Sequence, residues 1–268
     1  MTDTLIPAKK GKGLDDVIGR LVPEVPDTLL RQPSGSDPVL ETFRSFLQLN
    51  DDQEVLDILL KAQVTYALDP ARIDAYFQQF LVYEAESNWD IVTGLFTSKL
   101  IQDSYLHGHN NFKLTTRMNT NESLLMGSYL RGTKEKPINI TIDGDRHEMF
   151  GSNSHYVHSI IQGSVGGQCG EESKNCSYEI DEKWGCNLGR EAVESIFYLK
   201  AAPARTVHQM PDCRCGLHAQ KCTFTTSDKD ALEQLKHVPR GNRIIYLKEE
   251  IVHGQSVEVK QIVRDYDG

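Results

Sequence analysis

Apolar and polar residues alternate in short segments that recur between Gly132 and Thr226. The glycines that lead these segments, Gly132, Gly151, Gly170 and Gly189, follow one another at steps of nineteen residues, and the pattern resumes at Gly216 after an insertion. The positions six, eight and ten residues after each glycine are mostly apolar or small, and those between them are mostly polar. This alternation predicts one strand with one buried face in every repeat.

The spacing of these segments favours parallel strands. Nineteen residues leave no room for a helix between consecutive strands, and the segments are poorly placed for hairpins, which would reverse the direction of the chain. We therefore predict a parallel β-solenoid of about 19 residues per turn, with turns about 4.8 Å apart. Its interior would contain a ladder of Ile142, Ile161, Ile180 and Leu199.

The bends support the same architecture. Gly163, Gly166 and Gly170 form a G-x-x-G-x-x-x-G corner, although the preceding bend has His147 at its second glycine position and the following bend has Glu182 at its first. This pattern resembles the single-stranded β-helix known as the GXGXG domain, found at the C-terminal end of glutamate synthase and in a formylmethanofuran dehydrogenase subunit. The resemblance implies a structural part of a larger enzyme and carries over no catalytic residue.

Helical patterns precede the repeat. Aspartate caps a helix and proline suits its first turn, so Asp37-Pro38 and Asp69-Pro70 predict two helix starts. Asn50 or Asp51 predicts a third, and a further helix is expected from Asn88 to His107. The whole chain is predicted as α+β: an extended arm at 1–37, a helical domain at 38–107, the β-solenoid at 108–226, and a C-terminal cap of one helix and one hairpin at 227–268.

Composition and charge argue against two kinds of partner, nucleic acids and membranes. The formal net charge is −9, and the only basic cluster is Lys9, Lys10 and Lys12. Nucleic-acid binding is therefore not expected, because phosphate contacts require clustered cations. No apolar run reaches the roughly twenty residues of a membrane span, and no signal peptide is recognisable at the N-terminus. We expect a cytoplasmic protein with no membrane partner.

The six cysteines allow two interpretations. Cys186, Cys213, Cys215 and His218 could form a metal site, with zinc as the ion. The repeat instead places the six cysteines in three columns, two in each. The other residues of two of these columns are mostly hydrophobic, and this favours small buried core side chains. Cys186 and Cys213 fall in adjacent repeats, so a disulfide or a metal site remains open for this pair.

The sequence leaves two functional hypotheses. The first is a non-catalytic scaffold or assembly subunit that binds a protein partner or forms a homo-oligomer through the faces of its sheet. The alternative is an enzyme or metal-binding protein with its site near Cys186, Cys213 and His218. No catalytic residue is predicted, and no cofactor is expected apart from the possible zinc.

Overall fold

A computed structural model of the chain describes residues 37–49, 51–117, 123–145, 147–204, 215–252 and 255–266. Asp37–Gly268 forms one compact unit that is separate from Met1–Ser36. The arm predicted at 1–37 therefore lies outside the described residues, apart from Asp37.

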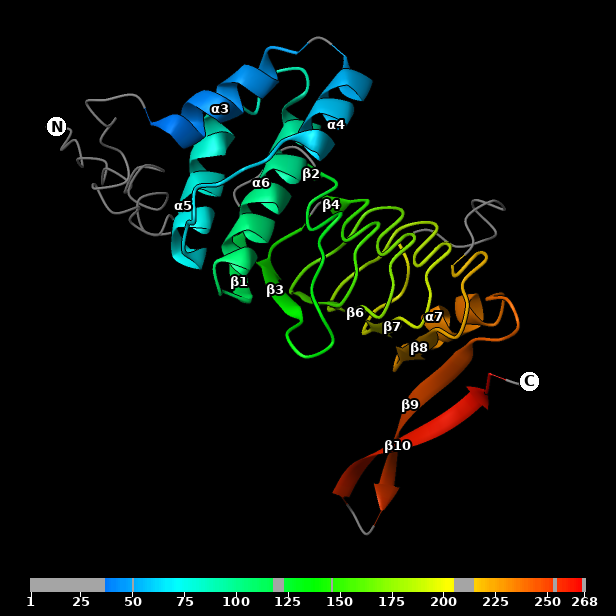
Figure 1. The fold of residues 1–268 in the computed structure, drawn as a ribbon. Helices are drawn as coiled ribbons and strands as arrows, with labels where there is room; N and C mark the ends of the chain where they lie inside the picture. The colour runs from blue at the N-terminus through cyan, green and yellow to red at the C-terminus, as the bar shows by residue number, and fades with distance from the viewer. Residues whose placement is uncertain are drawn as a thin grey trace, which may run out of the picture. The chain divides into compact units, whose positions relative to one another are not determined.

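The helical part begins where the sequence predicts. It contains α3 (Pro38–Leu47), α4 (Asp52–Lys61), α5 (Pro70–Phe80), the 3₁₀ turn η1 (Leu81–Tyr83) and α6 (Trp89–Leu106) (Figure 1). The carboxylates of Asp37, Asp51 and Asp69 accept hydrogen bonds from backbone N–H groups in the first turns of α3, α4 and α5. These bonds satisfy amides that have no partner inside the helix, which confirms the predicted caps.

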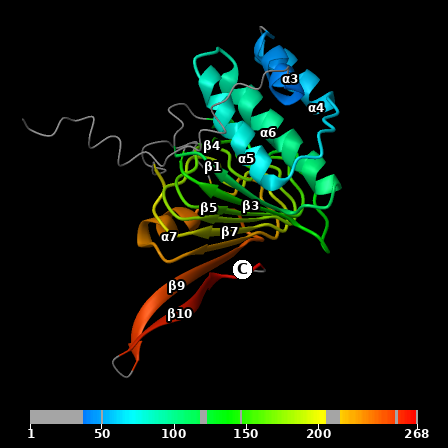
Figure 2. The same cartoon turned by 90° about the vertical axis from the view of Figure 1, so that its left-hand side faces the viewer.

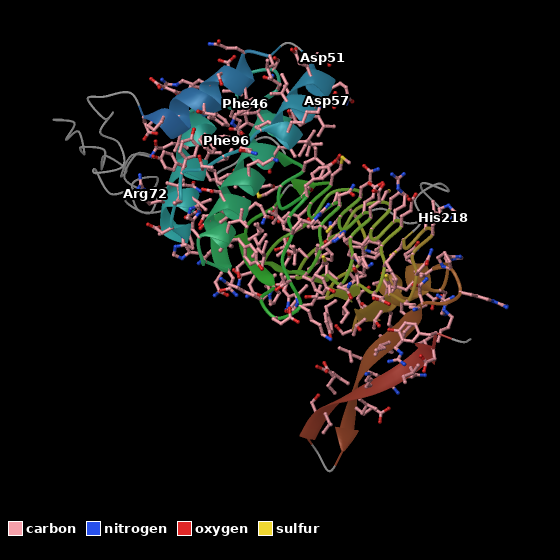
Figure 3. All side chains as sticks on the ribbon, viewed as in Figure 1. Phe46, Asp51, Asp57, Arg72, Phe96 and His218 are labelled. Carbon is pink, nitrogen blue, oxygen red and sulfur yellow. The ribbon has the colours of Figure 1, made fainter. Side chains whose placement is uncertain are left out.

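Helix α6 packs against both the other helices and the sheet region. Its buried residues surround the whole helix, and Phe96 lies 5.8 Å from Phe46, measured between ring centroids (Figure 3). On another face, Gly94 approaches strand β2 (Ser123–Leu124) so closely that a Cβ atom there would overlap the backbone oxygen of Leu124. Glycine is thus required for this contact.

One sheet of eight strands runs through the rest of the described chain. In spatial order its strands are β1 (Asn111–Thr115), β3 (Ile138–Asp143), β5 (Val157–Ile161), β6 (Ser177–Ile180), β7 (Ile196–Leu199), β8 (Thr223–Thr226), β9 (Arg243–Val252) and β10 (Gln255–Arg264). All neighbours are parallel except β9 and β10. A second sheet pairs β2 with β4 (His147–Glu148).

The register of the central strands follows the predicted period. Ile142 pairs with Ile161, Ile161 with Ile180, and Ile180 with Leu199, and all four side chains are buried. A second inward column contains the aromatic rings of Tyr178, Phe197 and Phe224. Consecutive rings in it lie 5.2 Å and 5.0 Å apart and are nearly parallel, so the core is a stack of like side chains.

The predicted parallel β-solenoid is wrong. Eight of the described strands form one open sheet rather than the walls of a closed coil, although the mixed α and β content agrees with the prediction. Only four to six residues of each repeat are extended. Apart from the short strand β4, the described remainder of the repeats consists mostly of turns, bends and isolated bridges. Many turn residues other than glycine have positive φ, among them Met149, Gln168 and Asn187, and such residues do not continue a strand.

The prediction also chose the wrong first glycine when it aligned Gly132 with Gly151, Gly170 and Gly189. Gly127, with φ of 68°, occupies the corner that Gly151 occupies in the next repeat, whereas Gly132 is not at positive φ. The chain takes seven residues from Arg131 to Ile138 but two from His155 to Val157, although both pairs are in register. The first repeat therefore contains an insertion of five residues between its corner and β3. Because the insertion precedes β3, the strands β3 and β5 are still nineteen residues apart, and the predicted spacing aligned them.

The C-terminal segment extends the sheet instead of capping it. Helix α7 (Lys229–Leu235) precedes β9, which pairs in parallel with β8 before turning into β10. Figures 1 and 2 show the hairpin leading away from β8, with helices at the other end of the sheet. The predicted helix and hairpin are present, but the expected cap is not formed, because the hairpin adds two strands and presents a new edge.

Candidate binding site on the outer face of the sheet

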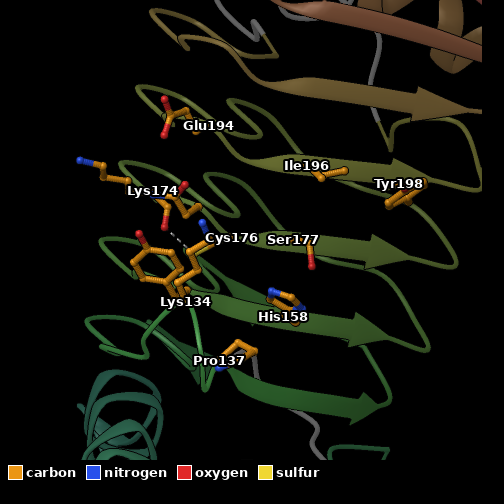
Figure 4. A pocket seen from close by; sticks show the side chains of 11 residues that line it. Lys134, Pro137, His158, Lys174, Cys176, Ser177, Glu194, Ile196 and Tyr198 are labelled. Atoms are coloured by element: carbon orange, nitrogen blue, oxygen red, sulfur yellow. Dashed lines mark hydrogen bonds between the residues drawn. The ribbon is translucent and has the colours of Figure 1, made fainter.

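An open pocket of about 760 Å³ lies on the outward face of strands β5 to β7. Its floor contains His158, Ser177 and Ile196, which are register partners on three adjacent strands, together with Tyr198 (Figure 4). Ile196 and Tyr198 are exposed by 37% and 43%. The small Ser177 side chain leaves Ile196 accessible from the neighbouring strand, so the floor combines an apolar area with polar groups.

Two lysines form part of the rim of the pocket. Lys134 belongs to the five-residue insertion, and Lys174 belongs to the corner that precedes β6. Neither ammonium group has an ion-pair partner among the described residues. The rim therefore carries two unneutralised positive charges next to the apolar part of the floor.

The insertion that presents Lys134 is held in place by hydrogen bonds. The Lys136 ammonium group donates to the Gly108 backbone oxygen at 2.7 Å, and the Tyr105 hydroxyl donates to the Lys136 backbone oxygen at 2.8 Å. The Lys136 backbone N–H also donates to the Thr133 hydroxyl. This anchoring against the end of α6 limits the freedom that a partner would have to remove on binding.

A column of basic residues beside the pocket adds the positive charge of Arg131 to that of the rim. Arg131, His155 and Lys174 are joined by parallel bridges on successive repeats. Burial lowers the pKa of His155, and the charges of Arg131 and Lys174 lower it further, so its imidazole is favoured in the neutral form. In a chain with net charge −9, this local excess of positive charge favours an anionic partner.

The acidic residue that lines the pocket, and two acidic residues on the same face of the sheet, have ion-pair partners. Glu194, which also lines the pocket, lies 3.6 Å from the ammonium group of Lys221. On the same outward face, Lys200 binds Glu179 and Asp181 at 2.6 and 2.7 Å. The Lys221–Glu194 pair is neutral, whereas Lys200 with its two carboxylates keeps one net negative charge. Among the residues that line the pocket, Lys134 and Lys174 have no ion-pair partner in the described part of the chain.

Four cysteines are core residues, as one of the two interpretations predicted. Cys169, Cys176, Cys215 and Cys222 are free and buried. Burial raises the pKa of each thiol, that of Cys222 to about 11, so these groups are protonated near neutral pH. Cys176 is among the residues that line the pocket, and its buried thiol donates to the Ser154 backbone oxygen at 3.2 Å. None of the four has the properties of a reactive thiolate.

The other predicted Cys and His residues are only partly described. Cys186 is disulfide-bonded and half-buried, Cys215 is a free buried thiol, and His218 is exposed at a turn (Figure 3). Cys213 lies outside the described residues, so its pairing with Cys186 and the four-residue site remain predictions. Disulfides are typical of oxidising compartments, and the cytoplasmic location likewise remains a prediction.

Within the described residues, no three His, Cys, Asp or Glu side chains are grouped so that they could hold a metal ion. No helix in the described ranges has both the length and the apolar character needed to cross a bilayer.

Comparison with known proteins adds no relative: no family model, curated protein or solved structure matches the chain. The resemblance to the GXGXG domain therefore concerns the glycine pattern alone.

Sequence reasoning missed the pocket, although one signal was present. Ile160, Ile196 and Tyr198 occupy outward positions of the repeat, where exposure to water favours polar side chains. Apolar residues at such positions indicate a contact surface. The participation of Lys134 had no comparable signal, because it depends on how the insertion folds back beside the strands.

Proposed function

We propose that this protein is a non-catalytic interaction subunit, and that the outer-face pocket binds an acidic segment of a partner protein that also carries apolar side chains. The observation that carries the proposal is the combination of exposed Ile196 and Tyr198 with unpaired Lys134 and Lys174 in one pocket. The apolar side chains supply contact area, and the lysines supply selectivity for negative charge.

The regular sheet supports this use of the site. Its inward side chains are locked in buried ladders, so the outward side chains project from a rigid floor. A rigid floor and an anchored rim reduce the entropy lost on association, which is an advantage for a shallow site with a limited contact area. The buried, protonated thiols support a binding role over thiol chemistry at this pocket.

A binding titration tests the proposal. We would measure fluorescence anisotropy of a short labelled peptide in which glutamate alternates with leucine. The variants are Lys174→Glu and Ile196→Asp, and Lys61→Glu, which reverses an exposed charge on α4, is the matched control. Each exposed ion pair contributes about 0.2–1 kcal/mol, and reversal replaces attraction with repulsion, so binding should weaken about tenfold with Lys174→Glu.

Ile196→Asp should weaken binding to a similar degree, because it replaces apolar contact area with a charge that repels the peptide. Lys61→Glu should leave the affinity unchanged. Equal affinities for the wild type and all three variants would overturn the proposal, as would an absence of binding to the wild type.

A further inference from the structure

The two edges of the eight-stranded sheet differ in whether other residues satisfy their backbone hydrogen-bonding groups. At the edge formed by β1, the Thr115 backbone N–H donates to the Asp74 carboxylate at 2.9 Å. The Thr115 backbone oxygen accepts a hydrogen bond from the Gln78 side-chain amide at 2.6 Å. Both side chains come from α5, which packs against β1. The helix thereby satisfies backbone groups that would otherwise attract another strand.

No described residue gives the other edge the same protection. β10 is the last strand of the sheet and pairs with β9 along one side. β8 pairs with β9 only over 243–246, so the hairpin continues beyond it as a two-stranded ribbon. Val257 on this ribbon is exposed by 42%, and Ile262, nearer the C-terminal end of β10, is exposed by 51%. A two-stranded ribbon is marginally stable in water by itself, so a further strand would stabilise it.

The charged residues of β10 indicate what kind of strand could pair with its free edge. Glu258 lies directly opposite Glu249 of β9, which is unfavourable because like charges face each other across the ladder. Lys260 lies opposite the uncharged Leu247. Glu258 and Lys260 are both exposed, and neither forms an ion pair with a described residue.

We propose that β10 pairs antiparallel with β10 of a second copy of this chain, in the register centred on Val259. This register places Glu258 of each copy opposite Lys260 of the other, so the dimer gains two cross-strand pairs of opposite charge. Centring the pair on Glu258 or on Lys260 would instead place two like charges opposite each other. The sequence of β10 is therefore complementary to itself in this register.

The pairing has a defined geometry. A twofold axis perpendicular to the sheet joins the two sheets into one continuous sheet. Both outer faces then lie on the same side, so the two pockets would face in the same direction. The pairing itself does not depend on the proposed function, because β10 does not line the pocket.

Charge reversal tests the register with the full-length chain. Wild-type protein should sediment with twice the 30.2 kDa mass of the monomer. Glu258→Lys alone and Lys260→Glu alone each create two like-charge pairs, and each should weaken self-association about tenfold or more. Mixing these two variants restores both opposite-charge pairs, so the mixture should dimerise as well as the wild type.

A cross-link provides a second measurement that is independent of affinity. Val259→Cys should give a disulfide-linked dimer on mild oxidation, because the two copies meet at this residue. Glu249→Cys, on β9, should give none. A monomeric wild type, variants that dimerise as tightly as the wild type, or a mixture that dimerises no better than its components would overturn the proposal, as would equal cross-linking of the two cysteine variants.

Discussion

The adjacent residues Phe197 and Tyr198 provide a direct test of the two faces of the sheet. Phe197 points inward, is fully buried and stacks between the rings of Tyr178 and Phe224. Tyr198 points outward and is exposed by 43%. Truncating each side chain to alanine changes the same strand at neighbouring positions, so the difference in stability reports the face and not the local backbone.

The expected magnitudes are well separated. Replacing a buried phenylalanine by alanine costs about 3–5 kcal/mol, and the cost is larger where the cavity cannot collapse. The two flanking rings belong to strands in fixed register, so we expect about 4 kcal/mol for Phe197→Ala. Tyr198→Ala removes a partly solvated ring and should cost less than about 1 kcal/mol.

Urea unfolding followed by far-UV circular dichroism measures both values. If Phe197→Ala does not fold, Phe197→Leu retains most of the side-chain volume and should cost about 1–2 kcal/mol. Equal losses from Phe197→Ala and Tyr198→Ala, or a larger loss from Tyr198→Ala, would refute the assignment of the inward and outward faces.

Three further predictions concern packing, pH and the disulfide. Gly94→Ala should destabilise the protein by about 1–3 kcal/mol, because the added methyl group would overlap the Leu124 backbone. Gly167→Ala is the control and should cost less in the same unfolding assay, because its added carbon would lie 3.4 Å from the Cys186 oxygen. Burial raises the pKa of Cys222 from 9.0 to about 11, so its stabilising contribution is complete below about pH 9 and is lost as the pH rises towards 11. This two-unit difference corresponds to about 3 kcal/mol, and urea unfolding at about pH 8 and pH 10.5 should show a smaller pH-dependent loss in Cys222→Ala than in the wild type. Alkylation in denaturant without reductant, mapped by mass spectrometry, should label the four free cysteines but not Cys186, and labelling of Cys186 would exclude its disulfide.

Local signals in the sequence predicted the elements and part of their pairing. Aspartates at 37 and 69 define helix starts because the capping interaction involves residues close in sequence. The nineteen-residue period defines the register of β5, β6 and β7 because an intact repeat preserves the inward ladder.

The arrangement of the remaining residues could not be predicted in the same way. Alternation defines the two faces of each strand but gives no information about the path that returns to the next strand. That path depends on residues such as Met149 and Gln168 at positive φ, a conformation for which their side chains have no preference. A five-residue insertion hid the equivalence of Gly127 and Gly151, and the same insertion brings Lys134 to the pocket.

The selectivity of the pocket for charge tests the central claim most directly. The measurement compares the affinities of two labelled peptides, one alternating glutamate with leucine and the other lysine with leucine, for the wild type and for Lys134→Glu combined with Lys174→Glu. The wild type should prefer the acidic peptide and the double variant the basic one, because the unpaired charges on the rim have changed sign. The same preference in both proteins would contradict the assignment of Lys134 and Lys174 to a binding site.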